Sequence, residues 1–204
     1  MNKTTSLFMP IPEFADHGGL PPFVNGHPTL PDARSPFLAT MQEVVERFCT
    51  TEHRAKLLKG LNEYRKHLYS GGFVSGSQWI DGSFVENVEK TQDRSPNDID
   101  LVTLYHRPIQ YQTNPQSWIV DYASHIRNLF FDTIIIKPVY LCDTYDIDLD
   151  AGSRAIVRNT TYWFGLFTDM RGNGSKKGII EVPLAVDPME FAAVDQAIGS
   201  RFSV

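Results

Sequence analysis

The sequence predicts an α+β fold in which one domain, residues 37–204, follows an extended arm, residues 1–36. The arm is rich in proline and glycine, and proline fixes φ and removes a backbone donor, so neither a regular helix nor a central strand can form there. The rest of the chain alternates segments of helical and of strand-like periodicity. A length of 204 residues, 42% of them hydrophobic, is sufficient for one core.

The arm carries more large apolar side chains than a disordered tail normally would. They are Phe8, Phe14, Leu20, Phe23 and Leu30. We therefore expect the arm to lie extended over the surface of the domain, although such an arm could also bind a partner protein.

Two helices are expected after the arm. In "SPFLATMQEVVERFC" apolar residues recur at helical spacing, and Thr40 and Glu43 form a possible capping box. A second helix over residues 51–69 has leucines on one face and basic side chains on the other. We expect the basic face to be solvated, with an acidic partner or a nucleic acid as the alternative contact. The basic residues are Arg54, Lys56, Lys59, Arg65 and Lys66.

The later elements follow from apolar periodicity and turn residues. Strands are expected at 78–81, 98–105, 132–150 and 179–184, and helices at 117–131, 153–167 and 188–202. Pro138 indicates an edge position or a bulge in the strand 132–150. Lys137 would then be a solubility residue of an edge strand, or it could approach a phosphate.

Composition narrows the classes of function. A net charge of −5 argues against a general nucleic-acid coat protein, although a nucleotide can still be bound through metal ions. Cys49 and Cys142 suggest reduced core residues of a cytoplasmic protein rather than a disulfide framework. No apolar run approaches the roughly 18 residues of a membrane span, so no membrane contact is expected. Zinc spacing, a P-loop and a hydrolase nucleophile elbow are all missing from the sequence.

The stretch "WIDGSFVENVEKTQDRSPNDIDLVTLY" contains the main candidate site. Side chains alternate along a strand, so Asp98 and Asp100 point to the same face of a largely buried strand. Burying two unpaired carboxylates costs several kcal/mol each. A divalent cation such as Mg²⁺ removes this cost because it prefers oxygen ligands. Loop capping or pairing with Arg or Lys is the alternative for an isolated Asp-x-Asp pattern.

The pair Gly82 and Ser83 adds a possible phosphate site at the end of the neighbouring strand. Glycine lets a phosphate approach the backbone closely, and Ser83 offers a hydroxyl and an N–H at a possible helix start. A phosphate-binding turn next to a metal-binding pair of aspartates would form one site for a metal–triphosphate.

These motifs resemble the signature of the polymerase-β-like nucleotidyltransferases, in which hydrophobic-Gly-Ser is followed by Asp-hydrophobic-Asp-hydrophobic. Here they read "IDGSF" and "NDIDLV", with a spacer of 14 residues between Ser83 and Asp98. The segments "GSFVENVE", "PNDIDLVT", "YWFGLFTDMRGNGSKKGIIEV" and "SPFLATMQEVVERF" resemble more closely a little-characterised bacterial family of minimal nucleotidyltransferase-like proteins. The resemblance implies a nucleotidyltransferase-like mixed β-sheet flanked by helices.

The resemblance also implies a third carboxylate on a later strand, so that Asp98, Asp100 and one more aspartate are catalytic and hold the metal. The candidates are Asp143, Asp146, Asp148 and Asp150. We favour Asp143, because "VYLCD" is the segment most typical of a buried central strand, and Asp148 is the second choice. In a regular strand Asp143 lies on the opposite face from the other three, which are otherwise an exposed acidic strand end.

Further candidates lie in "RGNGSKKG", where Arg171, Lys176 and Lys177 could close over a triphosphate, hold an acceptor strand or form a solvated turn. We include Lys177 with Gly82 and Ser83 as phosphate-binding residues. The tryptophans Trp79, Trp118 and Trp163 are expected in the core, although one of them could stack on a base.

The implied activity is transfer of a nucleotidyl group from an NTP such as ATP, with Mg²⁺ or Mn²⁺ activating the attacking hydroxyl and neutralising the leaving pyrophosphate. A protein hydroxyl, a tRNA end, a nucleotide or a small molecule could be the acceptor. The alternative is a catalytically weak binding module that acts as an antitoxin, a regulator or a subunit of a phage-defence system.

Overall fold

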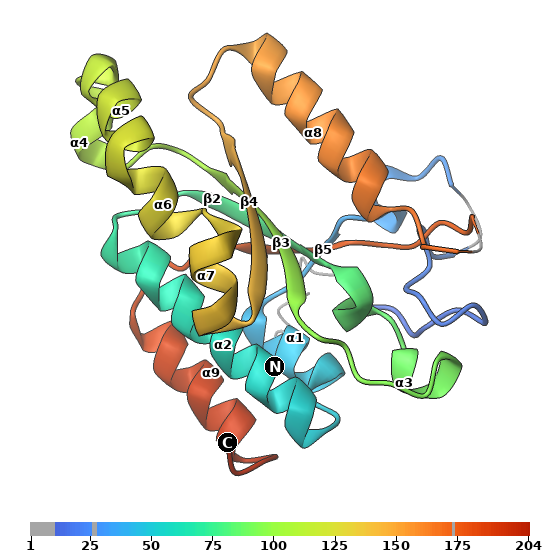
Figure 1. Cartoon of the computed structure of the whole chain (residues 1–204). Helices are drawn as coiled ribbons and strands as arrows, with labels where there is room; N and C mark the ends of the chain where they lie inside the picture. Colours follow the sequence, from blue (N-terminus) through green and yellow to red (C-terminus); the bar gives the residue numbers. More distant parts are fainter. Residues whose placement is uncertain (1–10, 26–27, 173) are drawn as a thin grey trace, which may run out of the picture.

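In the computed structural model, which describes residues 11–25, 28–172 and 174–204, five strands form one mixed sheet (Figure 1). Their order is β1-β5-β2-β3-β4. The bounds are β1 Phe37–Leu38, β2 Gly76–Asp81, β3 Ile99–Tyr105, β4 Cys142–Asp148 and β5 Ile180–Pro183. β2 runs antiparallel to both β3 and β5, whereas β3 and β4 are parallel, as are β1 and β5. The predicted α+β class is confirmed.

Helices cover the two faces of the sheet unequally (Figure 1). Helices α1 (Met41–Phe48), α2 (Glu52–Ser70) and α9 (Met189–Gly199) pack together over one face and form the larger part of the core. Helix α8 (Ser153–Phe167) covers the other face, above a smaller apolar cluster that includes Trp79 and Val102. The face beneath α8 is therefore more open than the face beneath α2.

Local sequence explains the helix starts. Thr40 Oγ1 accepts a hydrogen bond from Glu43 N, and the Glu43 carboxylate accepts one from Thr40 N, so the predicted capping box is present. The basic face of α2, however, is not uniformly solvated, which corrects the expectation. Arg54 and Arg65 are buried, because each guanidinium is bound by a carboxylate, Glu89 and Glu190 respectively.

The prediction of a strand over residues 132–150 is wrong in its first half. Residues Thr133–Tyr140 form helix α7, Leu141 ends it in the left-handed conformation, and β4 begins at Cys142. Pro138 is therefore inside a helix, and Lys137 is not on an edge strand. The physical reason is topological: β3 and β4 are parallel, so the chain between them must cross over, and helices are the usual connection.

The other elements are short. The expected helix at 117–131 consists of α5 (Pro115–Asp121), a π-helical turn η3 (Tyr122–Ile126) and α6 (Arg127–Phe130). A 3₁₀ turn η2 (Gly82–Val85) and α3 (Val88–Thr91) follow β2, and α4 (Ile109–Gln112) follows β3. A further 3₁₀ turn, η1 (Pro31–Ala33), lies in the arm. Among the described residues, no helix has the length and apolarity needed to cross a membrane.

The described part of the arm packs against the domain. Leu20 is buried, and its carbonyl accepts a hydrogen bond of 2.9 Å from Gly178 N, just before β5. Gly19 forms an antiparallel bridge with Glu86 in the segment that follows Gly82–Ser83. Of the apolar arm residues, Phe8 lies outside the described residues, and Leu30 is exposed. The arm thus supports the segments that border the candidate site.

Candidate active site

Three aspartates form a row across neighbouring strands at one end of the sheet. Asp81 on β2 is paired with Asp100 on β3, and Asp100 is paired with Asp143 on β4. Paired residues of adjacent strands point to the same face, and strands lie about 4.8 Å apart. The alternation places this row on the face beneath α8, with Trp79 and Val102. The register thus brings Asp143, the favoured third aspartate, beside Asp100.

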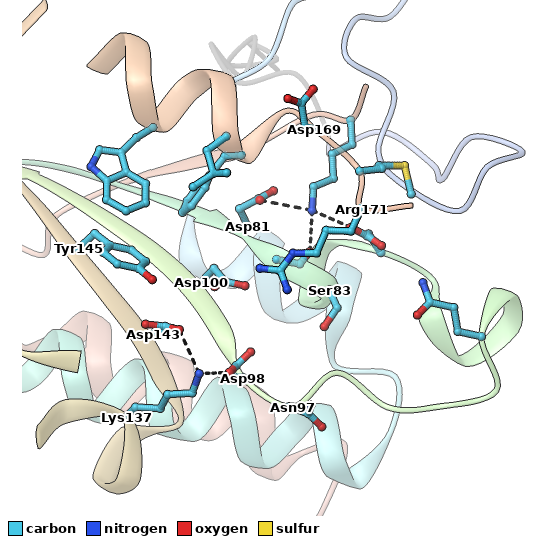
Figure 2. A pocket seen from close by; sticks show the side chains of 18 of the residues that line it. Asp81, Ser83, Asn97, Asp98, Asp100, Lys137, Asp143, Tyr145, Asp169 and Arg171 are labelled. Atoms are coloured by element: carbon cyan, nitrogen blue, oxygen red, sulfur yellow. Dashed lines mark hydrogen bonds and ion pairs between the residues drawn. The ribbon is translucent and has the colours of Figure 1, made fainter. Parts of the chain in front are cut away.

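The row opens into a cavity of about 510 Å³ between the sheet, α8 and the loop after α8 (Figure 2). Gly82, Ser83 and Asp98 also line it. Six carboxylates and four basic side chains contribute to the lining: Asp81, Glu86, Asp98, Asp100, Asp143 and Asp169, with Arg94, Lys137, Arg171 and Lys177. The cavity is therefore densely charged and nearly balanced, which suits a ligand that carries both phosphate and metal charge.

Lys137 of α7 lies between two of the predicted metal ligands. Its Nζ is 2.5 Å from Asp98 Oδ2 and 3.0 Å from Asp143 Oδ2, and hydrogen bonds with Asp98 raise its pKa (Figure 2). Asp143 also accepts a 2.5 Å hydrogen bond from Thr133 Oγ1. Burial opposes ionisation of Asp143, but the hydrogen bonds from Thr133 and Lys137 outweigh it, so the pKa of Asp143 is lowered. Lys137 thus supplies a positive charge for two half-buried aspartates, Asp98 and Asp143.

Asp100 occupies the centre of the row without such support. Within the part of the chain that the structure describes, no group donates a hydrogen bond to its carboxylate or forms an ion pair with it. Burial, followed by the charges of Asp98 and Asp143, raises the pKa of Asp100 to about 6. A bound cation would therefore stabilise the ionised form of Asp100.

Asp81 is a site residue that the sequence motifs did not predict. It is 3% exposed, its Oδ2 lies 3.3 Å from Lys177 Nζ, and its Oδ1 has no hydrogen-bond partner among the described residues. Burial raises the pKa of Asp81 to about 7 against the charge of Lys177. A signal was present in "WIDGSF", where Asp81 ends a buried strand two residues after Trp79 and so shares its face.

Lys177, predicted to bind phosphate, is buried beneath the turn. Its Nζ lies 2.7 Å from Glu86 Oε1 and donates a 3.0 Å hydrogen bond to the carbonyl of Gly82. Although burial disfavours its charge, Asp81 and Glu86 raise its pKa above the usual value. Lys177 thus borders the cavity while its ammonium group holds the Gly82 turn.

Position 82 requires glycine for two reasons, its backbone conformation and the nearby Asp100 side chain. Its φ is +79°, and a Cβ at this position would lie 1.8 Å from Asp100 Oδ2. The space left by the missing side chain is thus filled by the Asp100 carboxylate, and Ser83 follows directly on the cavity wall.

Arg171 reaches the cavity from the loop after α8. Figure 2 shows its guanidinium pointing inward, toward Asp100 and Ser83, and its charge acts to lower the pKa of Asp100. The sequence made both Arg171 and Lys177 candidates to close over a triphosphate, and it favoured Lys177 as the phosphate-binding residue. The structure gives Arg171 the exposed position and Lys177 the buried one.

Buried Arg54 holds the segment that follows Ser83. It pairs with Glu89 at 2.6 Å and donates hydrogen bonds of 2.7 Å to the carbonyls of Phe84 and Glu86. These contacts connect α2 to the segment that follows Gly82–Ser83, and because the guanidinium is buried, loss of its partners would leave a charge uncompensated. The position of Ser83 therefore depends on a side chain that the sequence assigned to a helix surface.

Asp148, the second choice for a third ligand, does not join the row. It is the last residue of β4, at the end of the strand away from Asp143. There its Oδ2 lies 2.8 Å from Arg107 Nη2 and accepts a hydrogen bond from Trp118 Nε1. Asp146 accepts hydrogen bonds from the hydroxyls of Tyr105 and Tyr122. Asp150 pairs with His106. The predicted exposed acidic end thus consists of Asp146 and Asp148 on the other face of β4 and of Asp150 in the turn after it, all with partners.

A family model described as "Family of unknown function (DUF6932)" matches residues 12–183. The chain belongs to this family. No curated protein and no solved structure matches it. The matched range of this DUF6932 protein includes every residue of the cavity named above.

The chemistry of the donor set fits a metal ion. Asp98, Asp100 and Asp143 offer the hard oxygen ligands that Mg²⁺ and Mn²⁺ prefer. As placed, however, no three His, Cys, Asp or Glu side chains among the described residues are arranged around a common metal position. Because Lys137 Nζ lies between Asp98 and Asp143, a cation bound by both would have to displace it. Lys137 is a long side chain, 43% exposed, so such a movement is sterically open.

Proposed function

We propose that this protein is a metal-dependent nucleotidyltransferase, which transfers a nucleotidyl group from an NTP to an acceptor hydroxyl. The observation that supports it most is the row Asp81, Asp100 and Asp143 beside the Gly82–Ser83 turn in one cavity. The resemblance to the polymerase-β-like nucleotidyltransferases points the same way. We extend the proposal to the fold: the mixed sheet is nucleotidyltransferase-like.

In this proposal Asp98, Asp100 and Asp143 hold the metal. When bound, Mg²⁺ or Mn²⁺ would activate the attacking hydroxyl and neutralise charge on the leaving pyrophosphate.

The phosphates would lie over the turn at the other side of Asp100. Ser83 offers its hydroxyl, and Arg171 can donate two parallel hydrogen bonds to phosphate oxygens. Lys177, which the sequence predicted to bind phosphate, would support the phosphate-binding turn through its hydrogen bond to the Gly82 carbonyl. Arg171 is exposed, whereas the Gly82 turn is held by Lys177. An exposed arginine above a fixed turn suits a substrate that must enter and leave.

A direct test incubates the protein with labelled NTPs, Mn²⁺ and an acceptor panel of proteins, tRNA, nucleotides and small hydroxyl compounds. We expect label transfer that is lost in Asp98→Asn, Asp100→Asn and Asp143→Asn. Asp148→Asn is the matched control, because it changes the same chemistry on the opposite face of the strand. Transfer that survives Asp100→Asn would refute the proposal.

A second candidate function rests on Lys137. An ammonium already bound to Asp98 and Asp143 is compatible with a catalytically weak nucleotide-binding module, in which the lysine takes the place of a metal. Such a module would serve as an antitoxin, a regulator or a defence-system subunit in the cytoplasm. Binding of NTP without divalent metal, and weakened by Lys137→Met, would favour this candidate over the enzyme.

A further inference from the structure

One wall of the cavity is aromatic and has no role in binding the phosphates or the metal. Tyr145, Trp163, Leu166 and Phe167 contribute to it. The rings of Tyr145 and Trp163 lie 4.1 Å apart at 33°, and Trp163 meets Phe167 edge-on at 5.8 Å. An apolar surface of this kind within a charged cavity indicates that the ligand has an apolar, planar part.

The wall begins directly beside the carboxylates. Tyr145 lies two residues after Asp143 on β4 and on the same face, roughly 7 Å farther along the strand. After Thr133 and Lys137, Tyr145 also helps to lower the pKa of the Asp143 carboxyl. Figure 2 shows Tyr145 on the opposite side of Asp100 from Ser83 and Arg171. The cavity thus has a phosphate side, a carboxylate centre and an aromatic side in that order.

Trp163 differs from the other two tryptophans in its burial. Trp79 and Trp118 are 5% and 3% exposed, whereas Trp163 is only partly buried and borders the cavity. Next to it, Leu166 is 51% exposed. The ring of Trp163 is thus less buried than the rings of the two tryptophans that pack in the core, and part of it faces the cavity.

We propose that Tyr145 and Trp163 bind the nucleobase of the NTP, an inference that rests on the proposed function and assigns the orientation of its substrate. The triphosphate lies toward Ser83 and Arg171, the α-phosphate at Asp100 and Asp143, and the base against the Trp163 ring. A volume of about 510 Å³ accommodates a whole nucleotide rather than a phosphate group alone. Because every base has a π-face, this wall binds purines and pyrimidines with little discrimination.

The first test uses the unaltered protein and compares ligands by calorimetry in Mn²⁺. We expect each NTP to bind about tenfold or more tightly than ribose 5′-triphosphate, which has the phosphates and sugar but no base. Inorganic tripolyphosphate should bind about as weakly as ribose 5′-triphosphate. Equal affinity for the NTPs and ribose 5′-triphosphate would overturn the base site while leaving the proposed function intact.

The second test removes the ring. Trp163→Leu should weaken NTP binding about tenfold and leave tripolyphosphate binding unchanged, and Trp163→Phe should restore part of the loss. Val157→Leu is the control, because Val157 also lies on α8 but is 65% exposed and does not line the cavity. Unchanged NTP affinity in Trp163→Leu contradicts the inference. If the unaltered protein binds neither NTPs nor tripolyphosphate, the base site and the proposed function both fail.

Discussion

The carboxylate of Asp100 lies in the space that a side chain on Gly82 would occupy, because a Cβ there would come within 1.8 Å of Asp100 Oδ2. The last residue before the turn, Asp81, is also the strand partner of Asp100. The turn and the row of carboxylates are therefore packed directly against each other, and a side chain at position 82 would collide with Asp100.

Gly82→Ala tests this unit. A positive φ of +79° and the collision with Asp100 should together destabilise the protein by about 1–3 kcal/mol and weaken NTP binding. Gly165→Ala is the control: it lies within α8, and an added methyl group there would meet no described atom within 4 Å, so it should be neutral or slightly stabilising. Urea denaturation measures both, and equal stabilities would show that the turn tolerates a side chain.

Lys137→Met tests whether the lysine competes with a metal. Removing the ammonium leaves Asp98 and Asp143 without their shared cation, so Mn²⁺ should bind roughly tenfold more tightly, equal to about 1.4 kcal/mol. Electron paramagnetic resonance of free Mn²⁺ measures this affinity. Lys66→Met, which removes an exposed lysine of α2, should leave it unchanged. Unaltered affinity in Lys137→Met would show that these two carboxylates do not bind the metal.

Asp100→Asn should stabilise the metal-free protein at pH 8. The pKa of Asp100 is raised from 3.8 to about 6, so the folded protein holds this proton more tightly than the unfolded chain does. Its contribution to stability therefore falls as pH rises from about 4 to above 6. The amide, which never ionises, avoids this loss, so the variant should be more stable than the unaltered protein by about 1–3 kcal/mol at pH 8.

The difference between the two proteins should shrink steadily toward pH 3.5, because Asp100 is then protonated in the folded protein and mostly protonated in the unfolded chain. Mn²⁺ should narrow the difference at pH 8, because only the unaltered protein gains a cation at this position. Thermal denaturation at several pH values tests the sign. A lower stability of Asp100→Asn at pH 8 would mean that the carboxylate is paired in solution.

Arg54→Met should destabilise the protein by about 3–5 kcal/mol, because it leaves Glu89 and two buried carbonyls without their partner. Arg54→Lys should not restore stability, since an ammonium cannot reproduce the forked contacts. Lys56→Met, two residues farther along α2 and exposed, should change stability by less than about 0.5 kcal/mol. Denaturation midpoints measure all three, and a mild effect of Arg54→Met would contradict the buried role.

Patterns within a few residues predicted much of this structure. The Thr40–Glu43 box marks the start of α1, and apolar periodicity located α8 and the strand from Ile99. The same short-range reasoning failed at α7, where three consecutive isoleucines are typical of a strand. Only the parallel pairing of β3 with β4 requires a crossover there, and pairing joins residues about 40 positions apart.

The sequence by itself determined the pair of aspartates, the glycine that must precede Ser83 and the two periodicities, because each depends on neighbouring residues in the chain. Tertiary structure alone decided that Asp81 joins the row, that Lys137 lies between Asp98 and Asp143, and that Lys177 is buried while Arg171 faces the cavity. Strand register and helix placement set these relationships, and both arise from contacts between segments that are distant in sequence.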